Sequence, residues 1–168
     1  MRAIGVIGWS GSGKTTLVTA LIAHFRLVGV SVSTVKHAHH TLTFDTPGKD
    51  SFRHAQAGAE EVLLASRNGF ALFSAAGEDR LDALLARLAP VDLVIVEGFK
   101  SYDMPKLEVY RPALGQPPLW PEMAVAAVVS DAALPGCPVP VLDISAVATV
   151  ADFIIRLVGV DQPDRASC

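Results

Sequence analysis

The 168-residue sequence predicts a single α/β domain with a mostly parallel sheet and helices on both faces. Three observations support this fold class. Short apolar runs alternate along the chain with segments of helical periodicity, and residues 91–96 are apolar except for Asp92, as in a central parallel strand covered on both faces. The length also suits one domain. We assign residues 1–160 to this domain and the polar residues 161–168 to a flexible tail.

The elements follow from local patterns. Residues 3–8 form an apolar run that ends in a glycine-rich turn, and residues 15–28 repeat apolar positions with a helical period. Further strands are expected at residues 30–35, 61–65, 70–73, 91–96, 107–110, 123–129 and 139–142, and helices at residues 51–57, 81–88 and, capped by Ser145, up to Val158. This alternation implies right-handed crossovers in a mostly parallel sheet.

Composition excludes several classes of function. Apolar residues make up 51% of the chain against 18% charged, which suggests that another subunit or a partner covers some hydrophobic surface. A net charge of −3 gives no basic footprint for nucleic acid. Without a membrane-length apolar segment or a signal peptide, we expect a cytoplasmic protein with no membrane partner.

The segment GWSGSGKT at residues 8–15 matches the pattern G-x-x-x-x-G-K-[ST] and lies between a predicted strand and a predicted helix. Glycines let the backbone turn its N–H groups toward phosphate oxygens, and the helix dipole adds to that attraction. Lys14 would reach the β and γ phosphates, and the Thr15 hydroxyl would ligate Mg²⁺. The predicted nucleotide-binding residues are Gly8, Ser10, Gly11, Ser12, Gly13, Lys14 and Thr15. The pattern therefore indicates a P-loop NTPase-like fold.

A carboxylate at the end of another central strand is expected to complete the Mg²⁺ site. Asp92 and Glu97 are the candidates, roughly 16 Å apart along one strand. Ligands gather at the carboxyl ends of parallel strands, which favours Glu97 and leaves Asp92 as a strand-start residue.

The element that would read the nucleotide base is not evident. The Asn-Lys-x-Asp element that reads guanine in many GTPases is missing, and only Ser130-Asp131 follows a strand in a comparable place. Asp131 is interpreted either as a turn residue or as a base reader.

Histidines and acids follow the second predicted strand. His37, His39 and His40 could bind a transition metal, lie in a solvated loop, or contact a substrate or nucleotide. The segment from Asp45 through Lys49 to Asp50 offers a turn, a cation and two acids that could close on phosphate as a switch loop does.

Three cations are predicted to lie near the same edge of the sheet. Lys100, Lys106 and Arg111 could hold an anionic second ligand or form a solvated rim.

With these elements the sequence resembles the molybdopterin-guanine dinucleotide biosynthesis adapter proteins, the MobB family. The resemblance covers nearly the whole predicted domain. It rests on the phosphate loop at residues 8–16, VKHAHH at 35–40, D-x-PGKDS at 45–51 with Arg53, AGA at 57–59, and VEGFK at 96–100 with Pro105-Lys106 and Glu108-Val109-x-Arg111.

The resemblance implies a homodimeric GTP-binding protein with weak GTPase activity. It would assist the guanylyltransferase that attaches GMP to molybdopterin, without carrying out the transfer. By position, the resemblance assigns Gly11, Gly13, Lys14, Thr15 and Thr16 to phosphate and Mg²⁺, and it makes Asp50 and Glu97 the carboxylates that act with Lys14 in hydrolysis. The choice of GTP over ATP comes from the resemblance.

Two other functions stay open. One is a small P-loop kinase that phosphorylates an anionic metabolite held by the three cations, although no Arg-rich helical lid is evident. The other is a GTPase metallochaperone that uses the histidines, although no Cys-bearing cluster accompanies them.

Overall fold

The computed structural model describes residues 1–38, 46–74 and 80–160. The chain forms two compact units. One holds residues 1–37 and the chain from residue 85 onward, and the other holds residues 38–84.

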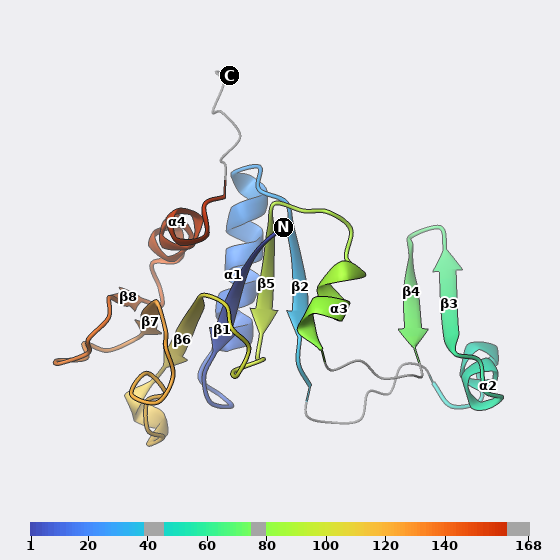
Figure 1. Cartoon of the computed structure of the whole chain (residues 1–168), viewed down its shortest axis with the longest axis horizontal. Helices are drawn as coiled ribbons and strands as arrows, with labels where there is room; N and C mark the ends of the chain where they lie inside the picture. Colours follow the sequence, from blue (N-terminus) through green and yellow to red (C-terminus); the bar gives the residue numbers. More distant parts are fainter. Residues whose placement is uncertain (39–45, 75–79, 161–168) are drawn as a thin grey trace. The chain divides into compact units, whose positions relative to one another are not determined.

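The first unit is built on a six-stranded sheet in which every pair of neighbouring strands is parallel. In spatial order the strands are β2 (Val32–Lys36), β5 (Leu93–Glu97), β1 (Arg2–Ile7), β6 (Lys106–Tyr110), β7 (Ala127–Ser130) and β8 (Val141–Asp143). Residues 93–96 of β5 are fully buried, because β5 lies between β2 and β1 and is covered on both faces. The α/β fold with a mostly parallel sheet is confirmed (Figure 1).

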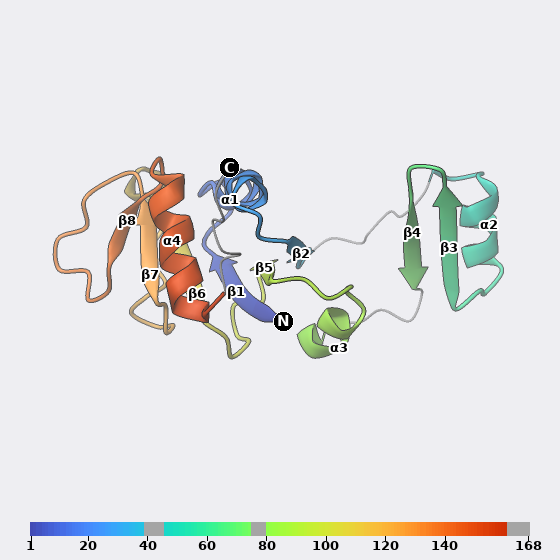
Figure 2. The same ribbon diagram turned by 90° about the horizontal axis from the view of Figure 1, so that it is seen from above.

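Two helices cover one face of this sheet. Helix α1 (Lys14–Leu27) and helix α4 (Val147–Val158) pack against each other and against β1 (Figures 1 and 2). Leu21 and Phe25 of α1 and Ile154 of α4 are fully buried against Ile4 of β1. This layer is the main hydrophobic core, and it holds the first turn of α1 against the sheet.

The second face of the sheet is buried as well. Val94, Val96 and Val128 are fully buried, and Leu119, from the proline-rich segment that follows β6, is 6% exposed. That segment contains the 3₁₀ turn η1 (Pro112–Leu114). The prediction that residues 105–121 are mostly irregular apart from one short strand is confirmed.

The second unit contains helix α2 (Asp50–Gln56) and an antiparallel hairpin of β3 (Glu61–Ser66) and β4 (Gly69–Ser74), while α3 (Leu81–Ala86) spans the boundary between the units. The predicted strands at residues 61–65 and 70–73 are confirmed, and they form this separate antiparallel hairpin. Only Arg67 and Asn68 separate the two strands, and a connection that short joins antiparallel neighbours, whereas parallel strands need a crossover of a dozen or more residues.

Asp92 joins the amino ends of β2 and β5. Its carboxylate accepts hydrogen bonds from the Ser31 backbone N–H at 2.8 Å and the Ser31 hydroxyl at 2.6 Å, and these bonds hold the pKa of Asp92 below its ordinary value. The Asp92 N–H donates in return to the Ser31 hydroxyl at 3.0 Å. The interpretation of Asp92 as a strand-start residue is confirmed.

The start of α4 differs from the prediction. Ser145 does not cap the helix, because its hydroxyl and its backbone N–H both donate to the Asp143 carboxylate, at 2.7 and 2.8 Å. Ala146 occupies the N-cap without a side-chain hydrogen bond. The Ser145 hydroxyl, which the sequence pattern predicted as the helix cap, is therefore engaged in a local Asx turn with Asp143.

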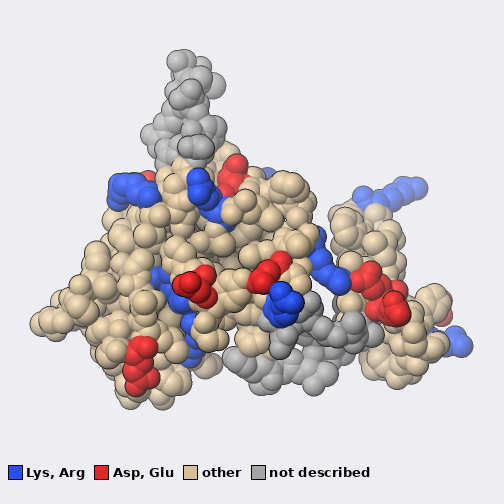
Figure 3. Space-filling model, in the orientation of Figure 1, with Lys and Arg blue, Asp and Glu red and all other residues tan. Residues whose placement is uncertain are grey.

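Charges of both signs are interspersed on the face drawn in Figure 3, which shows no continuous basic stripe. No helix in the described part of the chain is long and apolar enough to cross a membrane.

The packing of α1 predicts a contrast between two of its leucines. Leu21 is fully buried and Leu27 is 85% exposed. We expect Leu21→Ala to lower the free energy of unfolding by about 2–5 kcal/mol, because a buried cavity remains. The control Leu27→Ala should change it by no more than about 0.5 kcal/mol. Chemical denaturation measures both, and equal effects would contradict this packing.

Candidate phosphate-binding site

The loop between β1 and α1 follows a path that only glycine adopts readily. Gly8, Gly11 and Gly13 have φ values of 145°, 78° and 98°. A Cβ atom on Gly8 would lie 2.4 Å from the Val109 carbonyl oxygen, so the loop passes directly over β6. Gly13 is the N-cap of α1, and the positive end of this 14-residue helix therefore opens into the loop.

Lys14 lies inside this loop. Its ammonium group donates to the Trp9 carbonyl at 2.8 Å. Burial lowers the pKa of Lys14; the Glu97 charge opposes this effect, and the charges of Lys100 and Lys36 add to it. The Ser12 hydroxyl is buried without a hydrogen-bond partner in the described residues. The loop thus concentrates positive charge in a confined space that suits a phosphate group.

The first turn of α1 contacts the end of β5. The Thr15 hydroxyl lies 3.0 Å from one Glu97 carboxylate oxygen and 3.3 Å from the other. The Lys36 ammonium group, at the end of β2, lies 3.3 Å from the Glu97 carboxylate and 3.4 Å from the Thr15 hydroxyl. The strand register explains this meeting, because Glu97 pairs with Val6 of β1 and with Lys36 of β2. The two oxygen groups are of the kind that Mg²⁺ prefers.

Lys100 reaches the loop from the turn after β5. Gly98 and Phe99 both have positive φ, 96° and 49°, and this reverses the chain. The Lys100 ammonium group then lies 4.6 Å from the centre of the Trp9 ring. The Phe99 ring stacks at a tilt on His37, with 4.6 Å between ring centres. A non-glycine residue in this backbone region is uncommon and stores strain next to the site.

The other two predicted cations differ in their surroundings. The placement of Lys106 on the same rim is wrong, because Lys106 begins β6 and is only 8% exposed, on the opposite sheet face from α1. Arg111 follows β6 and donates from Nε to the Asp131 carboxylate at 2.7 Å. The sequence alone could not show that Lys106 is buried, because the face to which each β6 side chain turns follows from the pairing of β6 with β1 and β7.

Glu108 is a residue to which sequence reasoning gave no role. It is fully buried on β6, and its carboxylate accepts the backbone N–H groups of Leu119 at 2.8 Å and Trp120 at 3.0 Å. Burial raises the pKa of Glu108, and the two N–H bonds and Lys100 oppose this. The same segment touches the phosphate loop, since the Trp9 indole donates to the Pro117 carbonyl at 2.7 Å. The only sequence signal was the Glu-Val-x-Arg pattern.

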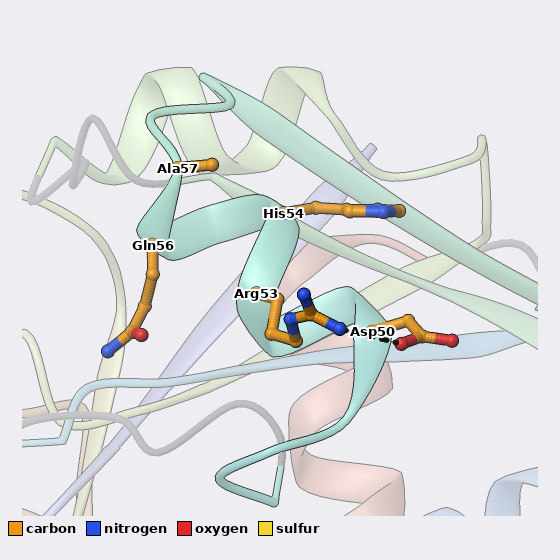
Figure 4. A pocket seen from close by; sticks show the side chains of 5 residues that line it. All are labelled: Asp50, Arg53, His54, Gln56 and Ala57. Atoms are coloured by element: carbon orange, nitrogen blue, oxygen red, sulfur yellow. Dashed lines mark ion pairs between the residues drawn. The ribbon is translucent and has the colours of Figure 1, made fainter.

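Asp50 and Lys49 lie in the second unit, whereas the phosphate loop belongs to the first. The Asp50 carboxylate is 90% exposed and pairs with Arg53 at 3.8 Å. An open pocket of about 530 Å³ lies along this helix, but its lining side chains point in different directions (Figure 4). A surface pocket of this kind holds no convergent set of groups, and we assign no chemistry to it.

Several predicted residues lie outside the described residues, namely His39, His40, Asp45 and the predicted tail. Within residues 1–38, 46–74 and 80–160, no three His, Cys, Asp or Glu side chains gather as a metal site.

A glycine-rich loop between a parallel strand and a helix, with Lys-Thr at the helix start and a carboxylate from the neighbouring strand, defines the P-loop NTPase class of fold. Residues 3–131 match the family described as MobB, molybdopterin guanine dinucleotide synthesis protein B. The chain belongs to the MobB family.

Bacterial relatives and a crystal structure agree with this family membership. The chain is 38% identical over 155 residues to the molybdopterin-guanine dinucleotide biosynthesis adapter protein of Escherichia coli (strain K12), with 88% of each chain covered. It is 36% identical over 154 residues to the protein of the same name from Haemophilus influenzae, with 90% of this chain and 86% of the relative covered. A crystal structure of molybdopterin-guanine biosynthesis protein B (mobB) superposes with a TM-score of 0.73 at 28% identity, covering 92% of this chain and 99% of that one.

The buried Glu108 carboxyl group predicts how the free energy of unfolding changes with pH. Its folded-state pKa is raised above the ordinary 4.5, so the folded chain binds this proton more tightly than the unfolded chain does. The resulting stability is complete below the unfolded-state pKa and is lost as pH rises through the folded-state pKa. We expect the free energy of unfolding of the native chain to fall relative to that of Glu108→Gln as the pH rises above about 4.5.

Urea denaturation at several pH values measures this difference. Glu122→Gln makes the same substitution at an exposed position of the segment that contacts Glu108, and it serves as the control. A difference between the native chain and Glu108→Gln that is constant across this range would contradict the assignment.

Proposed function

We propose that this chain is a homodimeric adapter that binds GTP with Mg²⁺, turns it over slowly, and supports a guanylyltransferase in attaching GMP to molybdopterin. One observation carries the nucleotide part of the proposal: the Thr15 hydroxyl and the Glu97 carboxylate meet at the mouth of the phosphate loop. Membership of the MobB family, whose E. coli relative is named as a biosynthesis adapter, supports the remainder.

In this proposal the N–H groups of residues 8–16 surround the phosphates, and Lys14 exchanges the Trp9 carbonyl for phosphate oxygen. Thr15 and Glu97 would hold Mg²⁺, which offsets negative charge on the triphosphate. Asp50 is the second proposed carboxylate, supplied by the segment after β2. The Lys36 ammonium group lies 3.3 Å from the same Glu97 carboxylate.

Lys100 favours one alternative function. A cation at the edge of the phosphate loop could hold an anionic metabolite, and the chain would then be a small kinase. The metallochaperone alternative depends on His37 and His39, and the tests below separate all three functions.

Lys14→Ala tests the phosphate site. Removing the ammonium group should weaken GTP binding by roughly 2 kcal/mol or more, about thirtyfold, because a charge-assisted contact is lost. Arg156→Ala, on the exposed side of α4, removes a cation away from the loop and should leave affinity unchanged. Isothermal titration with GTP measures both. Unchanged affinity in Lys14→Ala would refute the placement of the phosphates.

The adapter role is tested with the partner enzyme. Adding the chain to guanylyltransferase, molybdopterin and GTP should accelerate formation of the dinucleotide, and Lys14→Ala should remove the acceleration. Fast turnover with phosphate transferred to a small molecule would instead establish the kinase. Stoichiometric binding of nickel or zinc that is lost on changing His37 and His39 would establish the metallochaperone.

The hairpin supports the dimer. A two-stranded sheet alone is marginally stable in water, yet Leu63, Phe70 and Leu72 are 59%, 74% and 43% exposed. Leu63 pairs with Leu72, and Phe70 pairs with Ala65 on the same face, so these side chains form one apolar surface. A second copy of the chain would cover this surface at the dimer interface.

Charge on this surface should separate the dimer. We expect Phe70→Glu to yield monomers in sedimentation velocity, because an unpaired carboxylate would be buried in an apolar interface. Leu27→Glu, at an 85% exposed position on α1, is the matched control and should stay dimeric. Persistence of the dimer in Phe70→Glu would place the interface elsewhere.

A further inference from the structure

The Thr15–Glu97 contact orients the bound nucleotide relative to the sheet. Strands β5 and β2, which supply Glu97 and Lys36, lie on one side of β1. The metal-binding end of a triphosphate therefore faces that side. Its sugar and base must extend the other way, over the carboxyl ends of β6, β7 and β8 (Figure 1).

A carboxylate and a guanidinium group stand at those strand ends. Arg111 and Asp131 follow the paired residues Tyr110 and Ser130 directly, and the Arg111 Nε lies 2.7 Å from the Asp131 carboxylate. Arg111 keeps an extended backbone, with φ −129° and ψ 108°. It therefore continues the alternation from Val109, which faces the core beneath α1 and α4. The pair lies on the side of the sheet where α1 and the phosphate loop lie.

The distance suits a nucleoside. Asp131 directly follows β7, which lies two strands from β1, and at the usual strand spacing this is about 10 Å from the loop. Ile144 lines the intervening space: its Cδ1 is 3.5 Å from where a Cβ of Gly13 would lie, and its N–H donates to the Ser130 carbonyl at 3.0 Å. An apolar side chain between the phosphate loop and the carboxylate offers a surface for a sugar or base.

We propose that Asp131, held in position by Arg111, is the residue that selects guanine over adenine. This inference rests on the proposed binding of a nucleoside triphosphate at the loop. Guanine presents two adjacent donors, N1–H and the 2-amino group, which one carboxylate accepts together. Adenine presents a lone pair at N1 toward the same carboxylate and is disfavoured. Arg111 fixes the carboxylate, and its partly exposed guanidinium group lies beside the base.

The competing explanation is that Asp131 is only a turn residue in a surface ion pair, which contributes little to stability. Base analogues separate the two. Inosine triphosphate lacks the 2-amino donor, and xanthosine triphosphate replaces it with a carbonyl oxygen that a carboxylate repels. Asp131→Asn puts an amide donor opposite that carbonyl oxygen.

Affinities for GTP, ITP, XTP and ATP are measured by titration on the full chain, on Asp131→Asn and on the control Asp152→Asn, an exposed acid of α4. We expect the native chain to bind GTP about tenfold or more tightly than ITP, XTP or ATP. Asp131→Asn should lose about tenfold or more in GTP affinity and gain affinity for XTP, while Asp152→Asn behaves as the native chain.

The comparison of the four nucleotides on the native chain requires no substitution. It therefore remains decisive even if Asp131→Asn does not fold. Equal binding of all four nucleotides by the native chain overturns the inference, and so does a folded Asp131→Asn with unaltered GTP and XTP affinities. In both cases, GTP binding that depends on Lys14 leaves the proposed function standing. A native chain that binds none of the four overturns both proposals.

Discussion

The parallel pairing of β1 with β5 is the constraint on which the site depends. Val6 pairs with Glu97, so the phosphate loop and the carboxylate leave the sheet at the same level. A slip of one residue would turn Glu97 to the opposite face, away from Thr15. Packing on both faces prevents this slip, because residues 93–96 of β5 are fully buried between the helical layer and the second face. The hydrophobic core thus fixes the polar geometry of the site.

The sequence could predict those parts of the site that local patterns encode. The spacing of Gly8, Gly13 and Lys14 between a strand and a helix requires no tertiary knowledge. The choice of Glu97 over Asp92 needed only the direction of the strand, and the structure places Glu97 beside Thr15 and Asp92 beside Ser31. The rule that ligands gather at the carboxyl ends of parallel strands was sufficient to select Glu97.

Residues whose surroundings come from distant segments could not be predicted in the same way. Lys106 was expected beside Lys100 and Arg111 at the edge of the sheet, either holding an anionic ligand or in a solvated rim. The alternation of β6 instead turns it to the buried second face, where Glu108 accepts N–H groups from residues 11 and 12 positions later. The hairpin of β3 and β4 carries ordinary strand patterns, and only its two-residue turn distinguishes it from the parallel sheet. Arg111 and Asp131 meet because β6 and β7 are neighbours, which composition and spacing do not encode.

Lys36 contacts both residues that are proposed to bind Mg²⁺. One ammonium group lies 3.3 Å from the Glu97 carboxylate and 3.4 Å from the Thr15 hydroxyl, so the two proposed ligand oxygens already share a cation. A carboxylate that is only 12% exposed needs such a partner, because an unpaired charge at that depth is costly. A divalent ion taking this place would release Lys36 toward the nearby phosphates. In the proposed function the same positive charge would stabilise the chain before a nucleotide binds and would be available to the triphosphate afterwards.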